Sequence, residues 1–72
     1  MHKFVVCMDN AGYEASLELR KLYEVVADPD AQKYHQIRVI DESGEDYLFS
    51  KELFIEAHLS EVVSQKVAAI GH

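Results

Sequence analysis

Short runs of hydrophobic residues recur along this chain, and clusters of turn-forming residues separate them. The first run, residues 3–8 (KFVVCM), is continuous, β-branched and aromatic, which is typical of a strand buried on both faces. Four later segments have a similar strand-like composition: residues 22–27 (LYEVVA), 36–41 (QIRVID), 46–50 (DYLFS) and 54–59 (FIEAHL). The pattern therefore predicts a mainly β fold with five short strands.

Residues 13–27 fit two different structures. Alternate residues from Tyr13 to Leu19 are apolar, as they would be in a strand. Ala15 and Leu19 also begin a helical stripe, and the Glu, Leu, Arg and Lys residues around them favour a helix. We expect a strand at 22–27 after a long irregular loop. The alternative is an α+β fold with a helix near 13–27.

The third and fourth predicted strands form a hairpin around Glu42-Ser43-Gly44, where Gly44 supplies the left-handed residue that such loops need. Aliphatic and aromatic side chains then share one face, which we expect to be the core. These are Ile37, Val39, Tyr47 and Phe49. The opposite face is amphipathic and carries Arg38, Ile40, Asp46 and Leu48.

Four carboxylates gather at this hairpin, on Asp41, Glu42, Glu45 and Asp46. A calcium loop needs ligands at fixed alternate positions and a terminal bidentate Glu, and this stretch has neither. An Asp at the first position of a turn accepts backbone hydrogen bonds with its side chain. We therefore interpret the carboxylates as a solvated turn, and we expect no metal site and no cofactor.

The C-terminal segment predicts an amphipathic helix, with Ser60 as N-cap and Gly71 as its end. Its apolar residues recur at helical spacing and include the candidate protein contacts Val62, Val63, Val67 and Ile70. A helix this short needs a docking surface to be stable. We expect residues 60–72 to dock on the β domain formed by residues 1–59, near Ile40 and Leu48, or on a partner chain as a homodimer.

Composition limits the classes of function. The chain has 72 residues, which suits one small domain, and a net charge of −6, which makes nucleic-acid binding unlikely. The single cysteine, Cys7, cannot form an internal disulfide and points to a cytoplasmic protein. The N-terminal apolar run is too short for a signal peptide or a membrane span.

The sequence contains no recognised spacing of catalytic residues. Cys7, His35 and His58 could carry chemistry, but none of them lies in a nucleophile elbow, a CxxC or an HExxH pattern. We therefore expect a protein that is not an enzyme. Tyr13 and Tyr34 fall in predicted loops, and tyrosine is enriched at protein interfaces, so both are candidate partner contacts.

One resemblance adds to this interpretation. A strand, a long loop ending in LELRKLYEVV, the hairpin RVIDESGEDYLF and a short link before a last strand together resemble small uncharacterised bacterial proteins with an SH3-like barrel. The resemblance covers residues 3–57 and implies five strands in a bent barrel. It does not extend to proline-peptide binding, because the chain has no Trp and no ALYDY-like stretch.

The expected function is accordingly a non-catalytic protein-interaction or accessory module of the bacterial cytoplasm, with an unidentified protein partner. Two alternatives stay open at this point: a nucleic-acid- or ribosome-associated small barrel, and a metal-dependent or thiol-based regulator.

Overall fold

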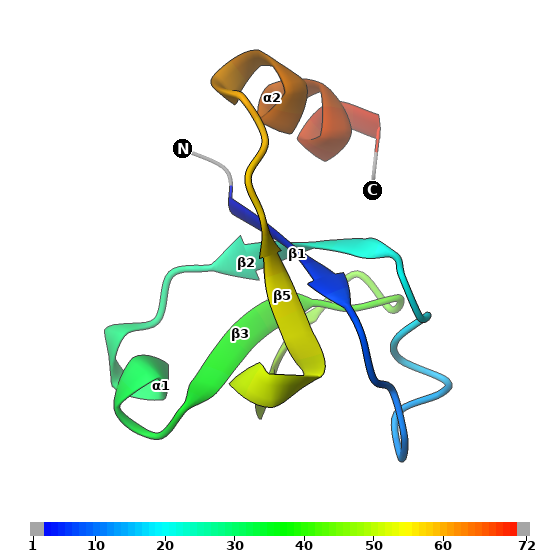
Figure 1. The fold of residues 1–72 in the computed structure, drawn as a ribbon, viewed down its shortest axis with the longest axis vertical. Helices are drawn as coiled ribbons and strands as arrows, with labels where there is room; N and C mark the ends of the chain where they lie inside the picture. The colour runs from blue at the N-terminus through cyan, green and yellow to red at the C-terminus, as the bar shows by residue number, and fades with distance from the viewer. Residues whose placement is uncertain (1–2, 71–72) are drawn as a thin grey trace.

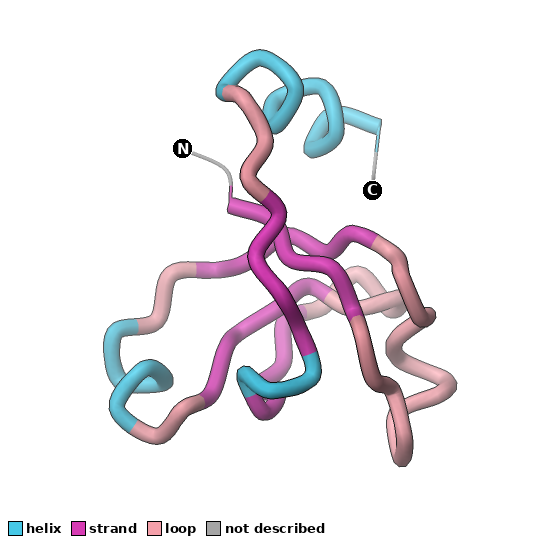
Figure 2. Tube along the Cα trace, viewed as in Figure 1, coloured by secondary structure: helices cyan, strands magenta, loops and turns pink. Residues whose placement is uncertain are grey.

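The computed structural model describes residues 3–70, without the side chains of Glu61 and Ile70. Within these residues the chain is mainly β, with short helices between and after the strands (Figures 1 and 2). The strands are β1 (Lys3–Cys7), β2 (Leu22–Val26), β3 (Gln36–Ile40), β4 (Asp46–Ser50) and β5 (Phe54–Ala57). The helices are α1 (Pro29–Lys33), the 3₁₀ turn η1 (Lys51–Leu53) and α2 (Glu61–Ile70).

The strands form one antiparallel sheet in the order β4-β3-β2-β1-β5. β4 and β5 are its two edges, so the sheet is open. The prediction of a mainly β fold with five strands and a C-terminal helix is therefore confirmed, whereas closure into a barrel is not observed. The helix considered near 13–27 is absent from the described part of the chain, where β2 follows an irregular loop.

The core lies on the inner face of this bent sheet. Its buried members come from all five strands and from one loop residue, and they are Val5, Cys7, Leu17, Tyr23, Val39, Phe49 and Phe54. Phe4 is also buried, although it points to the opposite face from Val5. β1 is thus covered on both sides, as its continuous apolar run predicts.

The β3–β4 hairpin has the predicted register, from Ile37 opposite Phe49 to Ile40 opposite Asp46. Gly44 adopts φ +85° at the turn, where a glycine avoids the cost of a left-handed backbone. The assignment of Tyr47 to the core is wrong, because its side chain is 47% exposed. It lies on an edge strand close to the turn, and its hydroxyl donates to Glu45 at the surface.

Residues 8–21 form the long loop that joins β1 to β2 (Figure 2). The loop is anchored by Leu17, which is fully buried and whose carbonyl accepts a hydrogen bond from Asn10. It returns to the sheet at Arg20, which has φ +63° and donates its N–H to the Cys7 carbonyl. An Arg at a left-handed position is strained, since its Cβ crowds the following carbonyl.

α1 begins where Asp28 accepts a hydrogen bond from the N–H of Ala31, and Pro29 occupies the first helical turn. The same carboxylate accepts a hydrogen bond from Arg38 at 2.9 Å, and this bond holds the pKa of Asp28 below its ordinary value. His35 follows the helix with φ +54°. This connection covers one end of the sheet beside β3 (Figure 1).

α2 is capped as predicted, because the Ser60 hydroxyl accepts a hydrogen bond from the N–H of Val63. The helix lies beyond the ends of β1 and β5 and away from β3 (Figure 1). Leu48 is 41% exposed, so the expected contact of α2 with this face is not formed within one chain. Docking of α2 on a partner chain stays a prediction.

The face that α2 turns toward its own chain differs from the predicted stripe. Ser64 is buried and Val67 is half-buried, whereas Val62 and Val63 are 62% and 45% exposed. The predicted end at Gly71 lies outside the described residues. Within residues 3–70, no helix combines the length and the apolar character that crossing a membrane requires.

Candidate functional site

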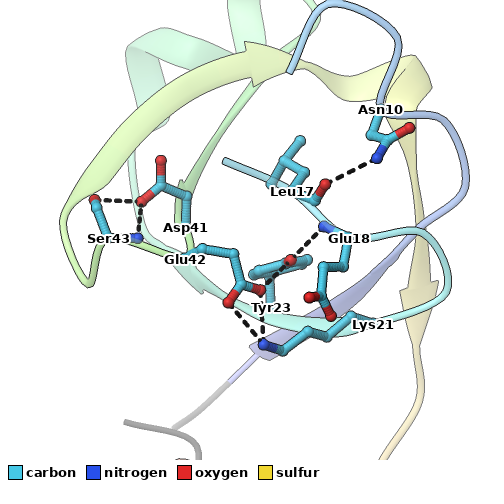
Figure 3. Close-up of polar contacts among 8 residues, drawn as sticks. All are labelled: Asn10, Leu17, Glu18, Lys21, Tyr23, Asp41, Glu42 and Ser43. Carbon is cyan, nitrogen blue, oxygen red and sulfur yellow. Dashed lines mark hydrogen bonds and ion pairs between the residues drawn. The ribbon is translucent and has the colours of Figure 1, made fainter. Parts of the chain in front are cut away.

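The acidic turn is the first place to look for a site, and Figure 3 shows the contacts of two of its carboxylates, Asp41 and Glu42. Asp41 is buried and accepts hydrogen bonds from the N–H and the hydroxyl of Ser43, at 2.8 and 2.5 Å. Its backbone carbonyl accepts another from the N–H of Gly44. The side chain of Asp41 therefore closes the turn, as the interpretation of this stretch as a turn predicts.

Glu42 is held by two residues from the start of β2 and the loop before it (Figure 3). Tyr23 donates its hydroxyl to Glu42 Oε2 at 2.5 Å, and Lys21 Nζ lies 2.6 Å from the same oxygen. The hydrogen bond from Lys21 lowers the pKa of Glu42, and the bond from Tyr23 acts in the same direction. We call Lys21, Tyr23 and Glu42 the Glu42 cluster.

The Glu42 cluster fastens the long loop to the hairpin. The N–H of Glu18 donates to the Tyr23 hydroxyl at 2.7 Å, and the N–H of Glu42 donates to the Ser16 carbonyl at 3.0 Å. Burial, together with the Glu42 carboxylate, raises the pKa of Tyr23, so this phenol stays protonated as a donor. A hollow of about 560 Å³ lies beside these groups, but their polar atoms already bind one another.

Cys7 and His58 are two of the residues that could carry chemistry. Cys7 is fully buried, and burial raises the pKa of its thiol, which disfavours the reactive thiolate. His58 is exposed beside Glu56, with the nearest N and O atoms 3.7 Å apart. Among residues 3–70, no three His, Cys, Asp or Glu side chains are grouped so that they could hold a metal ion.

A second cavity, of about 480 Å³, lies on the open side of the sheet. Its volume falls within the range of about 300–1,000 Å³ that is usual for ligand pockets. Three of its walls are β5 with the segment after it, the end of α1 with the start of β3, and the first residues of β1. We call this space the β5 cavity.

The floor of the β5 cavity is apolar and its rim is polar. The floor is formed by inner-face residues next to the core, namely Val5, Val25, Ile37 and Phe54. The rim carries Lys3, Gln32, Gln36, Lys51, Glu56 and His58. An apolar floor with a few polar groups around it is the usual composition of a binding site.

The free edge of β5 borders this cavity. Among the described strands β5 pairs only with β1, and Phe54, Glu56 and Ala57 all line the cavity. In an antiparallel strand at a sheet edge, alternate residues direct their N–H and C=O groups away from the sheet. The cavity therefore combines an apolar floor with backbone groups that another strand could pair with.

The residues predicted from the sequence as partner contacts are not brought together. Tyr13 packs edge-on against Phe49, with ring centroids 5.2 Å apart, whereas Tyr34 is 73% exposed after α1. The α1 connection and the 8–21 loop lie on opposite sides of the molecule (Figure 1). Val62 and Val63 are exposed on α2, and the side chain of Ile70 is outside the described part of the structure.

None of the predicted contacts lines the β5 cavity as the structure describes it. The cavity residues carry no sequence motif, because Lys3, Gln32 and Lys51 are ordinary polar residues separated by long stretches of chain. The strand-like run at 54–59 predicts a last strand but not its place at the edge of the sheet. Comparison of the chain with protein-family models, with curated proteins and with solved structures finds no match.

Proposed function

We propose that this protein is a non-catalytic protein-interaction module of the bacterial cytoplasm, which binds an extended segment of a partner protein in the β5 cavity. The observation that carries the proposal is the free edge of β5 beside an apolar floor. An extended peptide can add to such an edge as a further strand, with backbone hydrogen bonds giving affinity and side-chain pockets giving specificity.

The apolar floor beside the short strand β5 supports this mode of binding. β5 has four residues, and the Phe54 N–H already donates to the Lys51 carbonyl, so an added strand gains few backbone hydrogen bonds. Those bonds alone are weak, so an added strand also needs apolar side chains to bury. Val25, Ile37 and Phe54 provide that surface directly beside the edge.

The architecture supports the proposed relation to SH3-like barrels. The chain runs through a strand, a long loop, a central strand, a hairpin and a 3₁₀ turn before the last strand, in the order that the resemblance implies. β5 pairs back onto β1, and the remaining opening of the bent sheet holds the β5 cavity. Small barrels host many functions, so the proposed function depends on the cavity and not on the fold.

The test is capture of partners from nuclease-treated cytoplasm with three forms of the full chain. Ala57→Trp places a large ring at the cavity wall, whereas Ile55→Trp makes the same change on the same strand at a residue outside the cavity lining. We expect a protein that binds the wild type and Ile55→Trp but not Ala57→Trp. Urea unfolding of both variants first establishes that each one folds.

Two other results would contradict the proposal. Partners that bind all three forms equally would place the contact elsewhere on the surface. Partners that disappear with nuclease treatment would favour the nucleic-acid- or ribosome-associated class of small barrel instead.

A further inference from the structure

The basic residues of this acidic protein differ in whether they form ion pairs. Among the described residues, Lys21, Lys33 and Arg38 each form an ion pair with a carboxylate. The side chains of Lys3, Arg20, Lys51 and Lys66 form no hydrogen bond or ion pair in the part of the chain that the structure describes. Two of these four, Lys3 and Lys51, line the β5 cavity.

Two further groups of the rim, the amides of Gln32 and Gln36, can also donate hydrogen bonds to a ligand. The side-chain amides of Gln32 and Gln36 form no hydrogen bond to described residues, and each amide carries two N–H groups. The one rim carboxylate, Glu56, lies beside His58, with N and O 3.7 Å apart. The rim thus offers two ammonium groups and two amides to a ligand that accepts hydrogen bonds.

From this arrangement, and resting on the proposed function, we infer that the β5 cavity takes an extended peptide segment that carries both apolar residues and Asp or Glu. Alternate side chains of an added strand point to the same face. Lys3 lies on the same face of β1 as Val5, so the side chains that face the floor formed by Val25, Ile37 and Phe54 include both the apolar residues and the carboxylates that reach Lys3 and Lys51.

A carboxylate-bearing peptide fits better than a nucleic acid. The apolar floor and the strand edge match a peptide backbone, and the net charge of −6 repels a long polyanion. The two lysines act locally, because the attraction between exposed charges is screened beyond about 10 Å at ordinary salt.

The experiment selects linear peptides from a phage-displayed random library against the immobilised full chain. Binding of the selected peptides is then measured by fluorescence anisotropy to the wild type and to two matched variants. The first variant, Lys3→Gln with Lys51→Gln, removes both ammonium charges of the rim. Arg20→Gln with Lys66→Gln removes two charges that are also unpaired but lie outside the cavity lining.

We expect selected sequences that combine apolar residues with Asp or Glu. The rim variant should bind them roughly three- to tenfold more weakly than the wild type, since each exposed ion pair contributes little. The control variant should change the affinity by less than about twofold, because its charges lie outside the cavity lining. Ala57→Trp should abolish binding.

The outcomes separate this inference from the proposed function. Neutral or basic peptides whose binding is lost in Ala57→Trp would overturn the carboxylate inference and leave the proposed function standing. Acidic peptides that bind both charge variants equally would overturn the role of Lys3 and Lys51. Selection of no peptide, or of peptides indifferent to Ala57→Trp, would overturn both.

Discussion

The Tyr23 hydroxyl donates a 2.5 Å hydrogen bond to the carboxylate of Glu42, and this bond joins the second strand to the turn of the β3–β4 hairpin. The two residues are separated by 19 positions in the chain, and Tyr23 is buried. Lys21 approaches the same carboxylate from the end of the long loop. A turn that looks solvated in the sequence therefore holds the loop in place.

This relationship predicts how stability changes with pH. The folded state lowers the pKa of Glu42 below that of the unfolded chain, about 4.3 for a free Glu. The stabilisation is complete above that value and is lost as the pH falls through the lower pKa of the folded state. Glu42→Gln should lower the free energy of unfolding by about 1–2 kcal/mol at pH 7. Below pH ~4 the free energy of unfolding of Glu42→Gln should fall less steeply than that of the wild type.

Urea unfolding followed by circular dichroism between pH 7 and pH 3 measures both effects. Glu52→Gln is the matched control, since Glu52 is exposed and forms no hydrogen bond or ion pair among the described residues. Equal acid sensitivity of Glu42→Gln and wild type would show that the Glu42 cluster does not contribute in this way.

The left-handed backbone at Arg20 predicts a stabilising substitution. Arg20→Gly relieves the clash of Cβ with the following carbonyl, about 1 kcal/mol or more, and part of this gain is offset by the greater freedom of Gly in the unfolded chain. We expect a net gain of up to about 1 kcal/mol. Arg20→Ala keeps the Cβ and should give no gain. A lower urea midpoint for Arg20→Gly than for Arg20→Ala would contradict the assigned conformation.

The burial of Cys7 predicts an unreactive thiol. Because the thiol is fully buried and its pKa is raised by burial, we expect modification by a disulfide reagent at pH 7 to be limited by unfolding. The control is Cys7→Ala with Met8→Cys, which moves the thiol to an exposed neighbouring position. Rapid labelling of the native wild type at the rate of that control would revive the thiol-based regulator.

The position of α2 predicts the effect of removing it. Phe4 and Ser64 are both buried and both line the β5 cavity near the start of α2. Truncation after Leu59 should therefore expose part of Phe4 and lower the free energy of unfolding by about 1–2 kcal/mol. A chain of residues 1–59 that is as stable and as monodisperse as the full chain would show that α2 does not stabilise the sheet by covering Phe4.

The homodimer prediction is tested separately in the full chain. Val62→Ser with Val63→Ser changes two exposed residues and should alter stability by less than about 0.5 kcal/mol. If α2 pairs with its copy, these substitutions lower the mass measured by sedimentation at high concentration. Lys66→Ser, on the same helix, is the control.

Local patterns were sufficient to predict the strands and the hairpin register. Gly44 marks the turn, and the alternation from Ile37 to Ile40 leaves one register that buries Val39 and Phe49 together. The same reasoning misplaced Tyr47, because alternation does not say which strand becomes an edge. Edges depend on how the whole sheet assembles.

The β5 cavity could not be predicted for a related reason. Lys3 and Lys51 lie 48 positions apart and meet at the cavity only because β5 returns to β1. The Glu42 cluster is equally non-local, since Lys21 and Glu42 are 21 positions apart in the chain. Whether β5 is a free edge depends on the order of the strands in the sheet, and the hydrophobic periodicity of one strand does not reveal that order.

The central claim is that a partner segment adds to the free edge of β5. The most direct measurement is amide hydrogen exchange of the full chain, with and without the most enriched of the selected peptides. We predict that binding slows exchange at amides of residues 54–57, while the other edge strand, residues 46–50, exchanges as before. Protection at residues 46–50 or on α2, with residues 54–57 unchanged, would contradict the account.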